Sequence, residues 1–367
     1  MTGGGSGSHR RAHGNQGPVT VVVTGVGGAS LGEQCLKALR AASTGYRIIA
    51  TDLVRESFGL TLADVSHVVP PASDEGYLTE MLRLCAEHRV EALIPTSEAE
   101  LRVVSGARDR FAERGIFLPI NRHELICAGD DKFEALEKIS AAGVRTPAHL
   151  AVESIDEAAA WSDFPCVVKP AYGGSGSANV FIAQSADELR ALAGYLLGFE
   201  ERVAIEEYVG DAHSEFTVAV LRDMEGVLIH SIAIRRALLG GISNRAKVPN
   251  RTGRSELGKV LAISSGISQG RIDDFPEVRG PCEALAEELD SRGPLNIQCR
   301  VHRGELVVFE INPRFSGTTA LRALAGFNEP DLLIRLHVLG KSVERGFRYR
   351  HGTVLRGLSE VFYPDPE

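Results

Sequence analysis

The stretch Leu306–Gly317, which reads LVVFEINPRFSG, carries the most information about the fold. A second apolar run, LNIQCRV at 295–301, precedes it, and Arg303-Gly304 separates the two. Two such runs joined by a short glycine-containing turn predict an antiparallel hairpin. Glu310 and Asn312 lie two residues apart, so their side chains are expected on the same face of the second strand.

The polar residues of this hairpin suit a magnesium site. Gln298 lies on the partner strand and can face Glu310 and Asn312. Mg²⁺ prefers octahedral oxygen sites that phosphate and water complete. The alternative is an ordinary polar sheet face, although polar groups inside an apolar strand are costly to bury without partners. Arg314, again two residues further on, is expected beside them.

Upstream, the stretch Val203–Gly210 (VAIEEYVG) predicts an apolar strand that ends in two acids. A second strand begins at Glu215. The exposed backbone at this hinge could pair with an adenine edge, and Glu215 could accept hydrogen bonds from ribose hydroxyls. Without context, two solvated carboxylates at strand ends explain these residues equally well.

A lysine and a small-residue loop come earlier still. Lys169 ends the Val-rich strand 164–170 (FPCVVKP). Lysine is rarely buried unless paired, so it calls for an anionic partner such as a phosphate. The small residues of the loop that follows are Gly173, Gly174, Ser175, Gly176 and Ser177. They would let backbone N–H groups approach an anion, although a flexible hairpin loop is the alternative. No GxxxxGK[ST] occurs, which excludes a P-loop.

The segment Gly129–Lys132 (GDDK) opens a predicted amphipathic helix with Phe133, Leu136 and Ile139 on one face. Its acids suit the start of a helix. Lys132 is then either a solvated helix charge or a phosphate ligand.

Residues 19–120 alternate between apolar runs and helical patterns, which predicts a parallel sheet with helices on both faces. We expect strands at 19–24, 47–52, 67–70, 92–95 and 116–120, and helices ending near 39 and spanning 77–88 and 99–114. The carboxyl ends of such strands, including the loop Thr96–Glu100, are where a small ligand would bind. Glu98 and Glu100 could equally be charges at the start of a helix.

The turn after the first strand contains Gly25, Gly27 and Gly32, with Asp52 at the end of the second strand. This pattern approximates a dinucleotide-binding fingerprint. The alternative is that the glycines only permit a tight turn between strand and helix.

The composition limits the classes of protein to which the chain can belong. A chain of 367 residues with 44% hydrophobic and 24% charged residues fits two or three folded domains. A net charge of −8 argues against a dedicated nucleic-acid or anionic-membrane binder. No apolar run approaches the roughly 18 residues of a transmembrane helix. Six cysteines without a CxxC indicate reduced thiols, and the tail Met1–Gly17 lacks the apolar core of a secretory signal, so we expect a cytoplasmic protein.

Taken in order, these motifs resemble the ATP-grasp superfamily, most closely its carbamoyl-phosphate-synthase-like branch. The resemblance runs from about Val19 to about Val343. It rests on the series Asp131-Lys132, Val-Val-Lys169-Pro, Gly-Gly-Ser-Gly at 173–176, Glu-Glu-Tyr-Val at 206–209, Gln298, and Glu-Ile-Asn-Pro-Arg at 310–314. Any one motif is weak, but the ordered series is specific.

The resemblance implies an α/β chain with α+β character in its ATP-grasp part. A disordered tail (1–18) would precede a Rossmann-like pre-ATP-grasp domain (19–121) and an ATP-grasp domain (122–347). The two subdomains that sandwich ATP would be a smaller one that bears the lid (133–202) and a larger one with the metal site (203–347). A C-terminal tail (348–367) would follow. The glycines of the first domain then become mainly a fold signature.

The resemblance also implies roles for the nucleotide-binding residues. Lys132 and Lys169 would hold the ATP phosphates under the loop 173–178, and Lys169 would assist catalysis. Adenine would lie against the segment Glu206, Glu207, Tyr208 and Val209, mainly through backbone atoms. Glu215 would bind ribose.

The metal site and the reacting groups follow in the same way. Gln298, Glu310 and Asn312 would hold Mg²⁺, with two ions expected. Arg314 would stabilise the transferring phosphoryl group and the acyl phosphate.

The substrate residues are less defined. Arg235 and Arg236 are adjacent on a predicted strand and therefore face opposite ways; we favour Arg235 for a bidentate contact with a substrate carboxylate. Arg300 is a second candidate. The turn Ser316, Gly317 and Thr318 should border the acyl site. The stretch Gly240–Arg271 has no assigned role and is either a substrate-covering loop or a surface insertion.

The implied activity is that of an ATP-dependent carboxylate–amine ligase. It would join a small carboxylic or amino acid to an amine through an acyl phosphate, and release ADP and phosphate. The protein would form a homodimer and have no nucleic-acid or membrane partner. The branch's namesake has two tandem copies of this unit, whereas this chain has one, so carbamoyl phosphate synthesis is not expected. No biotin-carboxylase-type sequence follows Arg314, which puts bicarbonate chemistry in doubt.

Three alternatives stay open. One is a non-amine acceptor such as a thiol or hydroxyl, another is an NAD-dependent oxidoreductase that uses the first unit, and the third is a nucleotide-binding regulator without catalysis. The sequence names neither the acid nor the amine.

Overall fold

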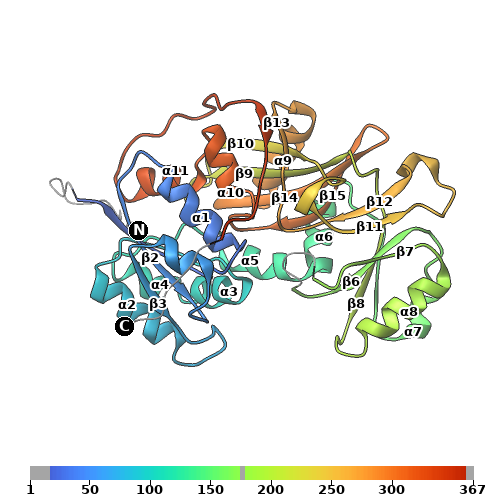
Figure 1. Ribbon diagram of the computed structural model, residues 1–367, viewed down its shortest axis with the longest axis horizontal. Helices are drawn as coiled ribbons and strands as arrows, with labels where there is room; N and C mark the ends of the chain where they lie inside the picture. Colours follow the sequence, from blue (N-terminus) through green and yellow to red (C-terminus); the bar gives the residue numbers. More distant parts are fainter. Residues whose placement is uncertain (1–16, 174–177, 361–367) are drawn as a thin grey trace, which may run out of the picture.

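The computed structural model describes residues 17–173 and 178–360. Gly174, Ser175, Gly176 and Ser177 of the expected phosphate-binding loop lie outside the described residues, as do residues 1–16 of the expected N-terminal tail. Three sheets dominate the arrangement: an N-terminal parallel sheet, a small antiparallel sheet beside it, and a large sheet that extends across both (Figure 1).

The N-terminal unit is a parallel sheet in the order β3-β2-β1-β4, as the alternation of strands and helices predicts. Its strands are β1 (Val19–Thr24), β2 (Tyr46–Asp52), β3 (Val65–Val68) and β4 (Ala92–Ile94). Its helices are α1 (Leu31–Arg40), α2 (Tyr77–His88), α3 (Glu98–Gly106) and α4 (Arg108–Ala112), with the short 3-10 helix η1 (Phe58–Leu62). All of β1 is buried because its alternate valines enter two different core clusters, one on each face of the sheet.

Two expected elements of this unit differ in the structure. The strand expected at 116–120 is reduced to one parallel bridge between Phe117 and Ala92. Pro119 has no N–H to donate, which prevents continued pairing. The helix expected over 99–114 is divided into α3 and α4 at Ala107.

The glycines of the β1–α1 turn are explained by the backbone. A Cβ at Gly32 would lie 2.3 Å from the carbonyl oxygen of Thr24, so only glycine allows α1 to begin this close to β1. Gly25 has a φ of +59°, in the left-handed region that favours glycine. The turn therefore needs Gly25 and Gly32 whether or not a dinucleotide binds there.

The small sheet is antiparallel, in the order β5-β8-β6-β7. Its strands are β5 (His149–Val152), β6 (Cys166–Pro170), β7 (Phe181–Ala183) and β8 (Val203–Glu207). Helices α7 (Ile155–Ala158) and α8 (Ala186–Leu196) share its apolar core. The sheet thus presents one face to these helices, and the other faces the large sheet (Figure 1).

The large sheet has the order β15-β14-β9-β10-β13-β16 and is antiparallel throughout. Its strands are β9 (Glu215–Arg222), β10 (Leu228–Arg236), β13 (Gly270–Asp273), β14 (Gly293–His302), β15 (Glu305–Asn312) and β16 (Gly352–Val354). The hairpin of β14 and β15 is the one that the sequence predicts. β16 lies within the segment assigned to a C-terminal tail, so part of that segment is an edge strand of the large sheet.

Helices cover both faces of the large sheet. On one face, α9 (Pro276–Glu288) and α6 (Lys132–Ala141) enter a core with β9, β14 and β15. On the other, α10 (Thr319–Ala325) and α11 (Glu329–His337) share a core with α1 and β1 of the N-terminal unit. This shared core joins the two parts of the chain. Helix α5 (His123–Asp130) links the N-terminal unit to α6.

The segment 240–271, called the bridge below, extends from the large sheet to the small sheet (Figure 1). It contains the antiparallel hairpin of β11 (Asn244–Pro249) and β12 (Val260–Ser264), with the 3-10 helices η3 (Gly241–Ser243) and η4 (Ser255–Leu257). Its far end contacts the chain just before β6 and just after β7. Arg254 Nη1 lies 2.9 Å from Asp163 Oδ1, and Gln184 Nε2 donates to the Pro249 carbonyl over 3.1 Å. Among the helices in the described part of the chain, none has the length and apolar character to cross a membrane.

Candidate active site

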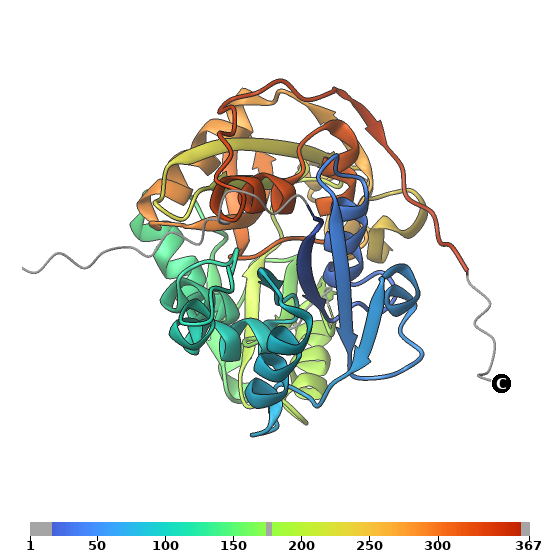
Figure 2. The same cartoon turned by 90° about the vertical axis from the view of Figure 1, so that its left-hand side faces the viewer.

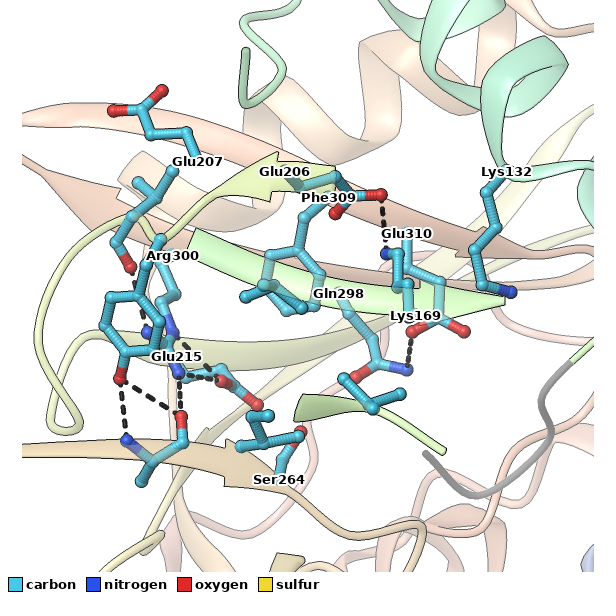
Figure 3. Close-up of a pocket in the computed structure, with 16 residues that line it drawn as sticks. Lys132, Lys169, Glu206, Glu207, Glu215, Ser264, Gln298, Arg300, Phe309 and Glu310 are labelled. Carbon is cyan, nitrogen blue, oxygen red and sulfur yellow. Dashed lines mark hydrogen bonds and ion pairs between the residues drawn. The ribbon is translucent and has the colours of Figure 1, made fainter. Parts of the chain in front are cut away.

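A first cavity lies between the small sheet and the large sheet, and Figure 3 shows its side chains. Strands β6 and β8 form one wall, and β12, β14 and β15 form the opposite wall. The candidate residues that line it are Lys132, Lys169, Glu206, Glu207, Tyr208, Val209, Glu215, Gln298, Arg300 and Glu310. Motifs far apart in the sequence thus converge on one cavity.

The two lysines lie at the same end of this cavity (Figure 3). Lys169 is almost fully buried, and its Nζ is 2.7 Å from Glu206 Oε1. Asp131 caps α6 by accepting hydrogen bonds from the backbone N–H groups of its first turn, which fixes Lys132 at the first helical position. Lys132 Nζ donates to the Gly173 carbonyl. Burial, and then the nearby Lys169 ammonium, lower the pKa of Lys132. Two neighbouring lysines, of which Lys169 is paired with Glu206, make this end of the cavity suitable for a polyanion.

The expected metal ligands lie together on β14 and β15. Gln298 is directly opposite Glu310 in the register, and Gln298 Nε2 donates to Glu310 Oε2 over 2.8 Å. Asn312 is opposite Asn296, and its Oδ1 accepts from Arg314 Nη2 over 2.8 Å. Within the described residues, no group of three or more His, Cys, Asp and Glu side chains is arranged to hold a metal. One carboxylate with two amides fits Mg²⁺ that phosphate oxygens and water complete, rather than a closed protein cage.

At the opposite end of the cavity, Glu215 is held by two arginines. Its Oε1 lies 3.0 Å from Arg236 Nη1, and its Oε2 accepts from Arg300 Nε over 2.9 Å. Burial opposes ionisation, but Arg300 and Arg236 outweigh it and hold the pKa of Glu215 below its ordinary value. Each carboxylate oxygen has a further lone pair, so Glu215 can still accept a hydroxyl.

Arg300 belongs to the first cavity and not to the substrate-binding region that the sequence suggested. Its guanidinium donates to the carbonyls of Val209 and Ala262 over 2.9 and 2.8 Å, and its Cζ lies 4.7 Å from the centre of the Tyr208 ring. It therefore holds the chain after β8 against β12, in the region expected to contact adenine.

The choice of Arg235 over Arg236 is not supported by the structure. Arg235 is exposed, with its Cζ 5.6 Å from the centre of the Phe275 ring. Arg236 is buried and donates to Gln298 Oε1 over 2.8 Å and to Ser264 Oγ over 2.9 Å. The two residues do face opposite ways. The sequence could not show which one points inward, because β10 is buried on both faces from Ser231 to Ile234.

A second cavity, of about 590 Å³, adjoins the first where Gln298 and Glu310 line both. Its walls come from three parts of the chain: the N-terminal unit (Gly25, Ala29–Leu31 and Thr96–Ala99), the bridge (Arg245 and Ser265–Ser268), and the large sheet with the turn after it (Thr217, Arg236, Asn296, Arg314 and Ser316–Thr318). The predicted turn Ser316–Thr318 does border this cavity. Its size is that of a small-molecule site.

The charged side chains that line the second cavity include both arginines and glutamates. Arg314 donates to Asn312 and lies 3.4 Å from Glu98 Oε1, which reaches in from the start of α3. Arg236 adds positive charge from the large sheet, and Arg245 adds it from the bridge. Arginines from the bridge and the large sheet, with Glu98 on the N-terminal wall and Glu310 at the junction, suit ligands that carry both signs of charge.

Sequence reasoning missed a buried group beneath this cavity. Arg322 is fully buried and donates to Asn296 Oδ1 over 2.7 Å and to Thr217 Oγ1 over 3.2 Å. Its Nη1 lies 3.4 Å from Glu329 Oε2. The sequence signals were Thr217 and Asn296, which are polar residues next to apolar ones in β9 and β14.

Three family models match successive parts of the chain. The model "PylC-like, N-terminal domain" matches residues 21–119, and "D-ala D-ala ligase C-terminus" matches residues 140–239. The model "ATP-grasp in the biosynthetic pathway with Ter operon" matches residues 258–357. Together they span the N-terminal unit and the two sheets that enclose the first cavity.

Curated relatives include carbamoyl phosphate synthase large chains. That of Methanoculleus marisnigri is 23% identical over 303 residues, which are 80% of this chain and 26% of the relative. The N-terminal section of the Methanopyrus kandleri protein is 27% identical over 312 residues, which are 80% of this chain and 50% of the relative. The chain thus spans between about a quarter and a half of these relatives.

Solved structures share the fold. An N5-carboxyaminoimidazole synthetase from Staphylococcus aureus complexed with ADP superposes with a TM-score of 0.64 at 16% identity, covering 92% of this chain and 81% of that one. An L-amino acid ligase from Bacillus licheniformis gives 0.61 at 15%, covering 88% and 75%. A D-alanine–D-alanine ligase from Bacillus anthracis gives 0.58 at 18%, covering 87% and 96%.

Proposed function

The chain belongs to the ATP-grasp superfamily, and from this premise we propose that it is an ATP-dependent carboxylate–amine ligase. It would join a small polar acid, such as an amino acid, to an amine and release ADP and phosphate. The observation that carries this proposal is the junction of the two cavities at Gln298 and Glu310. A nucleotide in the first cavity and an acid in the second would meet there.

In the first cavity, Lys132 and Lys169 would hold the phosphates of ATP, and the segment Glu206–Val209 would contact adenine. The side chains expected to hold Mg²⁺, with two ions proposed, are Gln298, Glu310 and Asn312. Bound Mg²⁺ supplies neutralisation of phosphate charge. Glu215, fixed by its two arginines, would accept the ribose hydroxyls.

In the second cavity, the substrate carboxylate would attack the γ-phosphorus, giving an acyl phosphate and ADP. Arg314 would stabilise the charge on the transferring phosphoryl group. The amine then attacks the acyl carbon, phosphate leaves, and the nitrogen loses a proton. Positioning and charge neutralisation account for the rate, which agrees with a site of lysines, arginines and amides.

The charges of the second cavity support an acid and an amine as substrates. Arg245 is exposed on the cavity wall and would suit a carboxylate, whereas Glu98 would suit an ammonium group. Among the described residues that line it there is no aromatic side chain, which favours polar substrates over apolar ones.

The test is a phosphate-release screen with ATP and Mg²⁺ over amino acids and small carboxylates, singly and in pairs. We expect one pair to give phosphate and ADP in equal amounts, together with an amide product. AMP as the product would replace this proposal with an adenylation mechanism. Release that depends on a thiol or hydroxyl compound would assign a non-amine acceptor, and saturable quenching of NADH fluorescence would favour the oxidoreductase alternative.

A further inference from the structure

The C-terminal segment after β16 runs along the outside of the molecule (Figure 2). β16 pairs with β13, with Val354 opposite Gly270, so the chain leaves the large sheet close to the bridge. Beyond this strand, Leu355 and Leu358 are each 72% exposed. Apolar packing therefore does not hold this part of the segment in place.

Arg356, between these two leucines, makes the contacts instead. Its Nη2 donates to the Gly317 carbonyl over 2.7 Å and to Gln34 Oε1 over 2.8 Å. Its backbone N–H donates to Gln269 Oε1 over 3.3 Å. A planar guanidinium can hold two acceptors at fixed positions, which a lysine ammonium does less well.

The three partners of Arg356 belong to the three segments of the chain that supply the walls of the second cavity. Gly317 lines the cavity itself. Gln34 lies one turn after Ser30 and Leu31 in α1, and Gln269 directly follows Ser268. One side chain, with its own backbone, thus connects the N-terminal unit, the bridge and the turn after β15.

The turn at Gly317 depends on these neighbours for its position. A Cβ at Gly317 would lie 2.4 Å from the carbonyl oxygen of Gly266, so the turn and the bridge are packed backbone against backbone. Arg356 is partly buried beside them, and burial lowers the pKa of its guanidinium while Glu33 opposes that shift. An arginine stays protonated in a protein, so its hydrogen bonds persist at every working pH.

We propose that Arg356 is a positioning residue that fixes the walls of the second cavity, and that the C-terminal segment thereby sets the affinity for the acid or amine substrate. This inference rests on the proposed function only for its kinetic consequence. Neither Arg356 nor its three partners line the first cavity, so nucleotide affinity is independent of it.

The first test uses hydrogen–deuterium exchange of the full chain in the Arg356→Gln variant. Arg350→Gln is the matched control, because Arg350 belongs to the same segment and also donates to a backbone carbonyl, that of Leu324. We expect faster exchange in peptides that cover 316–319 and 265–269, and unchanged exchange in 203–209. Unchanged exchange around Gly317, or the same increase in the control, would overturn the positioning role.

The second test is a kinetic split with the acid–amine pair that the screen identifies. Arg356→Gln should raise the KM for a substrate of the second cavity by about tenfold, with a smaller change in kcat, because charge-assisted hydrogen bonds are lost. The Kd for MgADP should stay at the wild-type value. An unchanged KM in an active wild-type enzyme would overturn the inference, whereas altered exchange in a protein that turns over no pair would contradict only the proposed ligase activity.

Discussion

The two cavities meet at Gln298 and Glu310 but are built from different kinds of structure. The lining of the first comes mainly from strands of two facing sheets and the chain that follows β8. That of the second comes mainly from turns and helix starts in the N-terminal unit, the bridge and the chain after β15. Strand register fixes the first set of side chains, and contacts between distant segments fix the second.

This difference has a consequence for function. In the first cavity, the buried charges are already paired with each other, as Lys169 is with Glu206 and Glu215 is with its arginines. A site of this kind is ordered before its ligand arrives. In the second cavity, Arg245 is exposed and Glu98 is partly exposed. We therefore expect sequence changes in the turns of the second cavity to alter which substrate it binds. The first cavity should bind the same nucleotide despite such changes.

The largest expected effect is at the junction. Glu310→Ala removes the only carboxylate of the proposed magnesium site. We expect ATP turnover to fall at least about 1000-fold, because bound metal contributes several kcal/mol of charge stabilisation. Coupled phosphate release measures the rate, and circular dichroism checks the fold. Asn312→Ala should have the same direction of effect.

Glu305→Ala is the control for this prediction. Glu305 begins the same strand, is exposed, and pairs with Arg145 at the surface. It should retain wild-type turnover. Full activity in Glu310→Ala would show that Glu310 does not hold Mg²⁺. It would also show that the reaction does not depend on the junction of the two cavities.

The second effect compares adjacent arginines on β10. Arg236→Gln breaks a buried ion pair with Glu215 and should lower the free energy of unfolding by about 3 kcal/mol. Arg235→Gln removes only an exposed contact with Phe275 and should cost less than about 1 kcal/mol. Urea denaturation of both variants measures the difference. Equal losses would mean that the inward orientation of Arg236 does not matter for stability.

These arginines also show which features of the site can be predicted from the sequence alone. The spacing of Glu310 and Asn312 predicted a shared face, and the register places both opposite β14. A period of two is a property of the strand itself, so it survives without tertiary information. The same period could not choose between Arg235 and Arg236, because apolar neighbours on both sides of β10 left neither face marked.

The sequence predicted only part of the second cavity, because its walls come from segments far apart in the chain. Its turn at 316–318 was expected because it directly follows Arg314 in the chain. The loop Thr96–Glu100, which carries Glu98, was also expected near a ligand because it follows a parallel strand. Arg245 lines the cavity from a segment that no local pattern connects to it, and the same holds for Arg356, which contacts the cavity wall at Gly317. Part of the supposed C-terminal tail became a strand, because a three-residue run such as Gly352–Val354 predicts pairing only when a free sheet edge is known.

The third effect separates the cavities. Glu98→Gln removes a carboxylate from the second cavity and keeps the shape of the side chain. We expect the KM for the amine to rise about tenfold, because a charged contact is replaced by a neutral one, while the KM for ATP stays unchanged. Glu113→Gln, on a 73% exposed side chain, is the control. A matching rise in the KM for ATP would show that Glu98 acts on the nucleotide instead.

The smallest effect concerns the charge of Lys132 in the first cavity. Burial and Lys169 lower its pKa below the ordinary value, so in the free protein it loses its proton at a lower pH than an exposed lysine. ATP phosphates would favour the protonated form, and binding would then take up a proton. The Kd for ATP should therefore begin to rise at a pH below the roughly 10.4 at which an ordinary lysine titrates, as titration calorimetry can measure.

Unfolding does not account for such a loss of binding. Because the pKa of Lys132 is lower in the folded state, the unfolded chain binds more protons in this range, and this group makes the protein more stable as pH rises. Lys132→Arg supplies the control, since arginine keeps its charge throughout. Its Kd should vary less with pH than that of the wild type. If both proteins show the same slope, the titrating group is not Lys132, and the charge of Lys132 does not hold the phosphates.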